Sequence, residues 1–213
     1  MYASSRSVYG GNRNLPFHEQ QAVTHPVSLY AASKKANELM AHTYSHLNKL
    51  PATGLRFFTV YGPWGRPDKA PMLFAKAILA GDPIKVFNHG KMQRDFTYID
   101  DIVDYVLRCC DKPATPNLEF DPMQPDQATA AAPHRMFNIG NSQPTELLRF
   151  IEVMEQALGR EAIKDFQPMQ PGDVVATAAN TEALEAWMGF KPSTSIEEGI
   201  QRFADWYKMI YQS

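Results

Sequence analysis

Tyr30 and Lys34 lie four residues apart near the start of a stretch with helical character over residues 28–48. Side chains four residues apart project from the same face of a helix, one turn from each other. An ordinary phenol ionises near pH ~10, and a cation one turn away favours its phenolate form. The pair therefore predicts a general base that takes a proton from a sugar or alcohol hydroxyl. The alternative is a tyrosine and a lysine that share a solvated helix face by chance.

The segment after this helix indicates an α/β fold. Residues 50–54 (LPATG) break the helix, and residues 55–59 form a short apolar strand bounded by Gly54 and Gly62. Ligands of doubly wound sheets lie at the carboxyl ends of the strands, so Thr59 and the residues after it should face a ligand. Further helices are predicted over residues 71–79, 144–158 and 195–211, and short strands over 86–88 and 136–139. The last helix is predicted to bury Ile200, Phe203, Trp206 and Ile210.

Composition excludes several classes of function. The 213 residues are 44% hydrophobic and carry a net charge of -2, which gives no basic surplus for binding nucleic acid. No apolar run approaches the ~20 residues that span a bilayer, and no signal peptide opens the sequence. The adjacent Cys109 and Cys110 are typical of reduced thiols, and the six histidines show no metal-ligand spacing. We therefore expect a cytoplasmic protein with no membrane or nucleic-acid partner and no metal.

Motifs on both sides of the Tyr-x-x-x-Lys pair carry a family resemblance. Residues 3–10 (ASSRSVYG) precede the pair and residues 54–63 (GLRFFTVYGP) follow it. In this order the blocks resemble the NAD-dependent epimerase/dehydratase branch of the extended short-chain dehydrogenase/reductase family. The sequence is most similar to the UDP-glucuronate 4-epimerase group in residues 59–67 (TVYGPWGRP), 94–101 (RDFTYIDD), 137–142 (FNIGNS) and 170–173 (QPGD).

The resemblance implies an α/β fold that comprises the C-terminal part of a Rossmann-type doubly wound sheet and a small α/β substrate-binding domain. Residues 1–65 would belong to the NAD-binding domain, and residues 66–213 mainly to the domain that binds the UDP-sugar. An open alternative is that strands and helices of residues 66–213 return to the Rossmann sheet. The family's glycine-rich phosphate loop does not occur in the sequence. We therefore expect the chain to be N-terminally truncated by on the order of a hundred residues.

The implied activity is NAD-dependent inversion of C4 of a UDP-sugar through a 4-keto intermediate, with UDP-glucuronate converted to UDP-galacturonate. The resemblance assigns catalysis to Ser5, Tyr30 and Lys34. It assigns cofactor binding to Tyr30, Lys34, Phe57, Thr59 and Val60. The alternative for Ser5 is a strand-end serine that caps its own backbone.

Substrate binding is assigned by the same resemblance. The implied residues are Ser4, Ser5, Thr59, Arg66, Met72, Phe74, Val86, Phe87, Arg94 and Asp173. Arg66 would bind the sugar carboxylate and Arg94 the diphosphate, because a guanidinium matches two anionic oxygens. Met72, Phe74 and the strand 86–88 would form the uridine pocket, and Asp173 would meet the ribose hydroxyls. The alternatives are a solvated loop arginine for Arg66 and simple core packing for the apolar residues.

Two further functions remain open. The chain as it stands would be an inactive fragment that binds a UDP-sugar without NAD, or it would belong to a related dehydratase or decarboxylase. Those enzymes place an acidic residue where Arg6 and Ser7 stand, so the sequence favours plain epimerisation. The resemblance also implies a homodimer of the full-length enzyme, formed through the helix that carries Tyr30.

Overall fold

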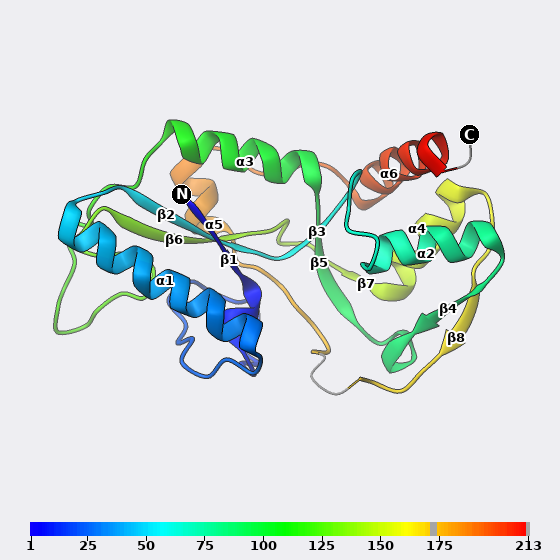
Figure 1. Ribbon diagram of the computed structural model, residues 1–213, viewed down its shortest axis with the longest axis horizontal. Coiled ribbons are helices and arrows are strands. Elements are labelled where there is room, and N and C mark those ends of the chain that lie inside the picture. Colours follow the sequence, from blue (N-terminus) through cyan, green and yellow to red (C-terminus); the bar gives the residue numbers. More distant parts are fainter. Residues whose placement is uncertain (171–173, 212–213) are drawn as a thin grey trace. The chain divides into compact units, whose positions relative to one another are not determined.

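A computed structural model describes residues 1–170 and 174–211 and divides the chain between two units (Figure 1). The first unit comprises Met1–Phe58, Ile102–Ser142 and Ala178–Lys191. The second unit comprises Thr59–Asp101, Gln143–Thr177 and Pro192–Ser213.

A parallel three-stranded sheet forms the centre of the first unit. Its order is β1-β2-β6, with β1 at Tyr2–Ser5, β2 at Ala52–Phe57 and β6 at His134–Ile139. The last residues of the three strands are paired in register, so the strands end level with one another. Helix α1, Leu29–Asn48, packs on all three strands and runs alongside them in Figure 1. The fold therefore has the Rossmann-like parallel sheet that the sequence predicted.

Shorter elements complete this unit. They are the 3-10 helix η1 (Arg6–Tyr9), helix α3 (Ile99–Asp111), whose first residues belong to the second unit, and helix α5 (Glu182–Met188), which contacts β6. A small apolar cluster lies beside the sheet and includes Tyr9, Phe17 and Phe58. The rings of Tyr9 and Phe17 stack at 4.5 Å.

The described residues of the second unit combine short strands with helices. Strand β3 (Thr59–Tyr61) pairs in parallel with β5 (Gln93–Tyr98), β7 (Pro144–Glu146) pairs antiparallel with β5, and β4 (Pro83–Val86) pairs in parallel with β8 (Ile163–Phe166). The helices are α2 (Ala70–Ala80), α4 (Leu147–Leu158) and α6 (Ile196–Tyr211), and the 3-10 helix η2 covers Phe87–Gly90. Their buried faces share one hydrophobic core, in which the rings of Phe96 and Phe150 stack at 4.2 Å.

Three predicted elements and the predicted burial of Ile210 differ from the structure. The strand predicted over 55–59 is two strands, β2 and β3, which belong to different units. The strand predicted over 86–88 ends at Val86, because Asn88 has a φ of 50° that extended backbone does not adopt. The helix predicted from Pro144 begins at Leu147, since the first three residues pair with β5 instead. Ile210, predicted to be buried, is 40% exposed.

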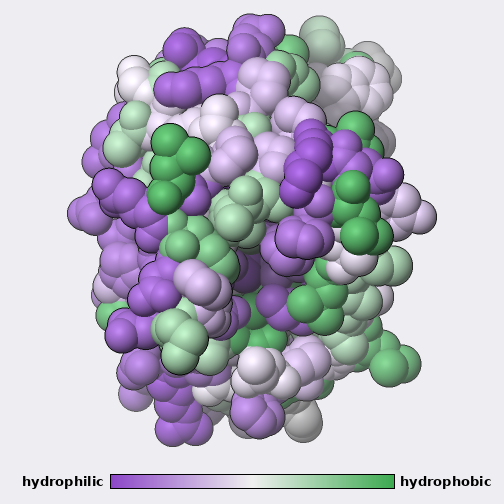
Figure 2. All heavy atoms as spheres, turned by 90° about the vertical axis from the view of Figure 1, so that its left-hand side faces the viewer, coloured by the Kyte–Doolittle hydropathy of each residue, from purple (hydrophilic) through white to green (hydrophobic). Residues whose placement is uncertain are grey.

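Within the described residues, no helix combines the length and the apolar character that crossing a membrane requires. Figure 2 views the molecule from the left-hand side of Figure 1, and hydrophobic residues are scattered there among many hydrophilic ones.

Candidate active site

Tyr30 and Lys34 lie in the first two turns of α1. The helix begins after Ser28, whose Oγ accepts a hydrogen bond from the backbone N–H of Ala31 at 3.1 Å, the usual arrangement at a helix N-terminus. Tyr30 is 55% exposed, and the Lys34 ammonium lies 5.8 Å from the centre of its ring. The phenol and the ammonium therefore share one face of the helix, and the phenol is open to a ligand.

Lys34 also connects the helix to the sheet. Its Nζ donates a hydrogen bond of 3.1 Å to the backbone oxygen of Ala3 in β1. An ammonium has three N–H donors, so this bond leaves donors for a ligand. The bond holds the cation two residues from Ser5, the last residue of β1.

Ser5 and Phe57 are partners at the carboxyl ends of β1 and β2. Ser5 Oγ accepts from the backbone N–H of Ser7 and donates to Ser7 Oγ, both at 3.2 Å. This is the capping role that the sequence left open for Ser5. The part of the chain that the structure describes contains no hydrogen bond between Ser5 and Tyr30, so the contact of Ser5 with a substrate stays a proposal.

Ser4 lies in a buried polar network. Its Oγ donates to Glu38 Oε1 at 2.6 Å, and Glu38 accepts two bonds from Arg56, at 2.9 Å and 3.0 Å. Arg56 Nη1 also donates to the Tyr9 hydroxyl at 3.0 Å. The Ser4 hydroxyl, predicted to bind substrate, is therefore bound to α1.

Glu38 and Arg56 were not among the predicted site residues. The available signal was an arginine inside the apolar strand 55–59, because a charge on a buried strand requires a partner. Burial alone would raise the pKa of Glu38 and lower that of Arg56. The hydrogen bonds and opposite charges of the pair outweigh burial, so the pKa of Glu38 lies below its ordinary value and that of Arg56 above. The pair is therefore ionised at neutral pH.

Thr59, Val60 and Arg66 belong to the second unit. Thr59 and Val60 are half-buried residues of β3. The Arg66 side chain is 70% exposed and binds the carboxylate of Asp68 at two points, 3.0 Å and 2.6 Å. Arg66 thus already holds a carboxylate of its own chain in the two-point geometry expected for a sugar carboxylate.

The predicted uridine-pocket residues divide into two groups. Met72 and Phe74 on α2 and Val86 on β4 are buried in the core of the second unit, the alternative role that the sequence left open. Phe87 is half-buried at the start of η2. Among these side chains, Phe87 has the exposure that a stacking contact with a base requires.

Arg94 is half-buried on β5, and its Nη1 donates to the backbone oxygens of Gln93 and Val175 at 2.9 Å and 3.2 Å. These bonds hold one terminal nitrogen of the guanidinium against two segments of the second unit. Asp173 lies outside the described residues.

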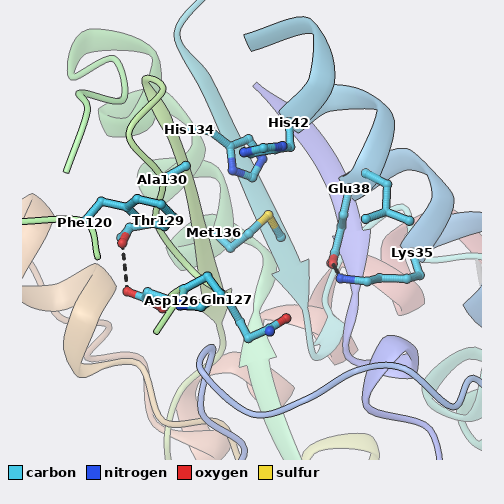
Figure 3. Close-up of a pocket in the computed structure, with 12 residues that line it drawn as sticks. Lys35, Glu38, His42, Phe120, Asp126, Gln127, Thr129, Ala130, His134 and Met136 are labelled. Atoms are coloured by element: carbon cyan, nitrogen blue, oxygen red, sulfur yellow. Dashed lines mark hydrogen bonds and ion pairs between the residues drawn. The ribbon is translucent and has the colours of Figure 1, made fainter. Parts of the chain in front are cut away.

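A pocket of ≈ 220 Å³ opens beside α1 in the first unit. In Figure 3, His42, Glu38 and Lys35 of α1 lie on one side, Asp126 and Thr129 lie opposite, and His134 and Met136 of β6 lie between them. These residues come from β6, from α1 and from the segment that precedes β6.

His134 in this pocket predicts a pH-dependent stability. It is 5% exposed, and its Nε2 is 2.9 Å from the Tyr2 hydroxyl. Burial, with a smaller contribution from His42, lowers the pKa of His134 to about 4 from 6.5. The unfolded chain therefore takes up a proton below pH 6.5 that the folded chain does not, and stability falls as the pH falls. The free energy of unfolding is expected to fall by about 2 kcal/mol between pH 7 and pH 5.

Urea denaturation of wild type and His134→Gln at pH 7 and pH 5 measures this dependence. The variant keeps a polar partner for Tyr2 and is expected to lose most of the pH-dependent difference. His25→Gln, at an exposed histidine, is the matched control and should behave as wild type. An unchanged difference in His134→Gln would assign the effect to other groups.

The residues of the first unit fit a dinucleotide. An exposed phenol, an ammonium with spare donors and the half-buried Phe57 lie on or beside strands whose carboxyl ends are level. Neutral hydroxyls and a flat ring are the groups that such side chains bind, and strand ends are where doubly wound sheets bind ligands.

The chain is similar to known proteins in sequence and in structure. Residues 1–120 match the model of the NAD dependent epimerase/dehydratase family. The chain is 54% identical over 212 residues to protein CapI of Staphylococcus aureus, and the match covers 100% of this chain and 64% of that protein. It is 50% identical over 216 residues to a probable UDP-glucuronate 4-epimerase of Rhizobium meliloti, covering 100% of this chain and 62% of that protein.

A similar solved structure is the UDP-glucuronic acid 4-epimerase of Bacillus cereus in complex with UDP-glucuronic acid and NAD. The TM-score is 0.81 at 29% identity, over 98% of this chain and 61% of that chain. The chain spans less than two thirds of the length of these relatives.

The parallel sheet and the Tyr30–Lys34 pair on α1 define a protein of the short-chain dehydrogenase/reductase class. Within that class, the chain belongs to the NAD-dependent epimerase/dehydratase family, as the sequence motifs predicted.

Proposed function

We propose that this chain carries the catalytic residues of a NAD-dependent UDP-sugar 4-epimerase, and that its substrate is UDP-glucuronate. The observation that carries the proposal is the Tyr30–Lys34 pair, with Lys34 bonded to Ala3 two residues before Ser5. The similarity to a probable UDP-glucuronate 4-epimerase supports the choice of substrate.

The proton transfers are assigned to the first unit. Tyr30 Oη takes the proton of the C4 hydroxyl and later returns a proton to the same oxygen. Lys34 places its positive charge beside the Tyr30 ring, and Ser5 Oγ donates to the substrate oxygen. NAD, when bound, supplies the reversible oxidation of the sugar at C4. Tyr30, Lys34, Phe57, Thr59 and Val60 would hold it.

Substrate recognition is assigned mainly to residues 66–213, and cofactor binding to residues 1–65. Arg66, with Thr59, would bind the sugar carboxylate in the geometry that Arg66 now offers to Asp68. Arg94 would bind the diphosphate and Asp173 the ribose. Phe87, which follows Val86 in the chain, would contact the uracil. The absence of an acidic side chain at Arg6 and Ser7 favours epimerisation over elimination.

A hybrid enzyme tests the activity. The segment of the Staphylococcus aureus relative that this chain does not match is joined to the chain, and the product is incubated with UDP-glucuronate and NAD. We expect UDP-galacturonate, identified by NMR of the sugar protons, and no turnover by the 213-residue chain alone. A folded hybrid, verified by circular dichroism, that forms no epimer would overturn the proposal. A decarboxylated pentose product would favour the decarboxylase alternative.

We also propose that the enzyme acts as a homodimer formed through α1. Besides Tyr30, the exposed large hydrophobic side chains of this helix are Leu29, Leu39, Met40, Tyr44 and Leu47. A second copy of the helix would cover them, and sedimentation of the hybrid enzyme measures its mass.

A further inference from the structure

Two successive turns of α1 are hydrogen-bonded to two successive residues of β1. Lys34 Nζ donates to the backbone oxygen of Ala3 at 3.1 Å. One turn later, Glu38 Oε1 accepts from Ser4 Oγ at 2.6 Å. Because Ser5 follows directly, these two bonds set the position of the end of β1 along the helix that carries Tyr30.

Glu38 is itself held in one orientation. Arg56 donates from Nε to Oε1 at 2.9 Å and from Nη2 to Oε2 at 3.0 Å. Arg56 is 0% exposed and Glu38 3% exposed, so water does not compete for either side chain. The planar two-point contact fixes the plane of the carboxylate as well as its distance. Arg56 is also the paired residue of Ser4 across β1 and β2.

The same arginine reaches the segment that follows Ser5. Its Nη1 donates to the Tyr9 hydroxyl at 3.0 Å and to the backbone oxygen of Glu19 at 3.3 Å. The Tyr9 hydroxyl in turn donates to Asn138 Oδ1 at 2.6 Å. The segments before and after Ser5 are therefore bonded to one buried ion pair.

Stability alone is a poor explanation for this pair. The free energy needed to remove two charges from water offsets most of the attraction between them. Well-packed apolar residues often stabilise a fold equally well. Apolar residues cannot, however, give a directional bond to the Ser4 hydroxyl. The geometry of Glu38 and Arg56 therefore suits a role in positioning Ser4.

We propose that Glu38, clamped by Arg56, is a positioning residue that holds Ser4 and thereby fixes Ser5 relative to Tyr30 and Lys34. This inference rests on the proposed function for its catalytic meaning. In this proposal the Ser4 hydroxyl binds Glu38 of α1 and does not contact the substrate.

Hydrogen exchange of the full 213-residue chain, followed by mass spectrometry, tests the placement without cofactor or substrate. Ser4→Ala removes the hydroxyl, and Ser4→Thr keeps it. Ser45→Ala is the matched control, because Ser45 lies on the same helix, is fully buried, and its Oγ has no hydrogen-bond partner among the described residues.

Ser4→Ala is expected to speed exchange roughly tenfold in peptides covering residues 2–9 and 29–38, since it removes a bond to a charged group. Exchange in α4 should not change. Ser4→Thr and Ser45→Ala should resemble wild type. Equal acceleration of exchange in α4 would assign Ser4 a general structural role and overturn the proposal. Unchanged exchange near Ser5 would show that Ser4 has no such role and would also overturn it.

Kinetics of the hybrid enzyme provide the second readout. A positioning role predicts that Ser4→Ala lowers kcat roughly tenfold and leaves KM for UDP-glucuronate unchanged. A raised KM with unchanged kcat would return Ser4 to the substrate-binding residues and overturn the proposal. An inactive wild-type hybrid would count against the proposed function, whereas the exchange result would still decide the placement.

Discussion

Tyr30→Phe is expected to lower kcat of the hybrid enzyme by roughly 10²–10⁴-fold, the range that a positioned general base contributes. The substitution removes one oxygen from a side chain that is 55% exposed, so the fold should not be affected. KM for UDP-glucuronate should change little, because the phenol acts in the proton transfer more than in binding. Initial rates at saturating NAD measure the effect.

Tyr44→Phe is the matched control for this experiment. Tyr44 lies on the same helix and is also exposed, but it is more than three turns from Tyr30. Its variant should have wild-type kcat. If Tyr30→Phe retained wild-type kcat as well, Tyr30 could not be the base, and the proposed mechanism would fail even if the hybrid epimerised its substrate.

Arg56→Met is expected to reduce the free energy of unfolding by about 3–5 kcal/mol, the usual cost of leaving one buried charge without its partner. Glu38 would remain buried with no counter-charge of comparable strength, although Lys35 contacts its Oε2 at 3.2 Å. The Tyr9 hydroxyl would lose a donor at the same time. Urea denaturation followed by circular dichroism measures the change.

Adding Glu38→Leu to Arg56→Met should recover much of that loss, because no unpaired charge remains in the interior. The recovered protein would keep its fold without the bond to Ser4. A loss below about 1 kcal/mol in the single variant would mean that water reaches Glu38 and that the pair is not buried in solution.

The sequence predicted the parts of the site that local patterns determine. Helix α1 was predicted over residues 28–48 and is observed at Leu29–Asn48, because a capping serine and a long run without breakers are local signals. Tyr30 and Lys34 follow from that helix, since their spacing alone places them on one face.

The contacts of β1 with α1 could not be predicted in this way. The bond between Ser4 and Glu38 depends on the register of β1 against β2 and on the angle of α1 across both strands. Neither is encoded by the residues near Ser4. The break after Val86 was missed for a different reason, because the positive φ of Asn88 is a backbone property that asparagine tolerates without requiring it.

The division of the chain has a practical consequence for any exchange of parts between relatives. Six segments alternate between the two units, so the backbone passes from one unit to the other five times. No single cut releases either unit as a continuous piece. Recombination at one crossover point between residues 59 and 191 would divide the core of each unit between the two parents, so substrate preference is better transferred between homologues by grafting side chains than by swapping fragments.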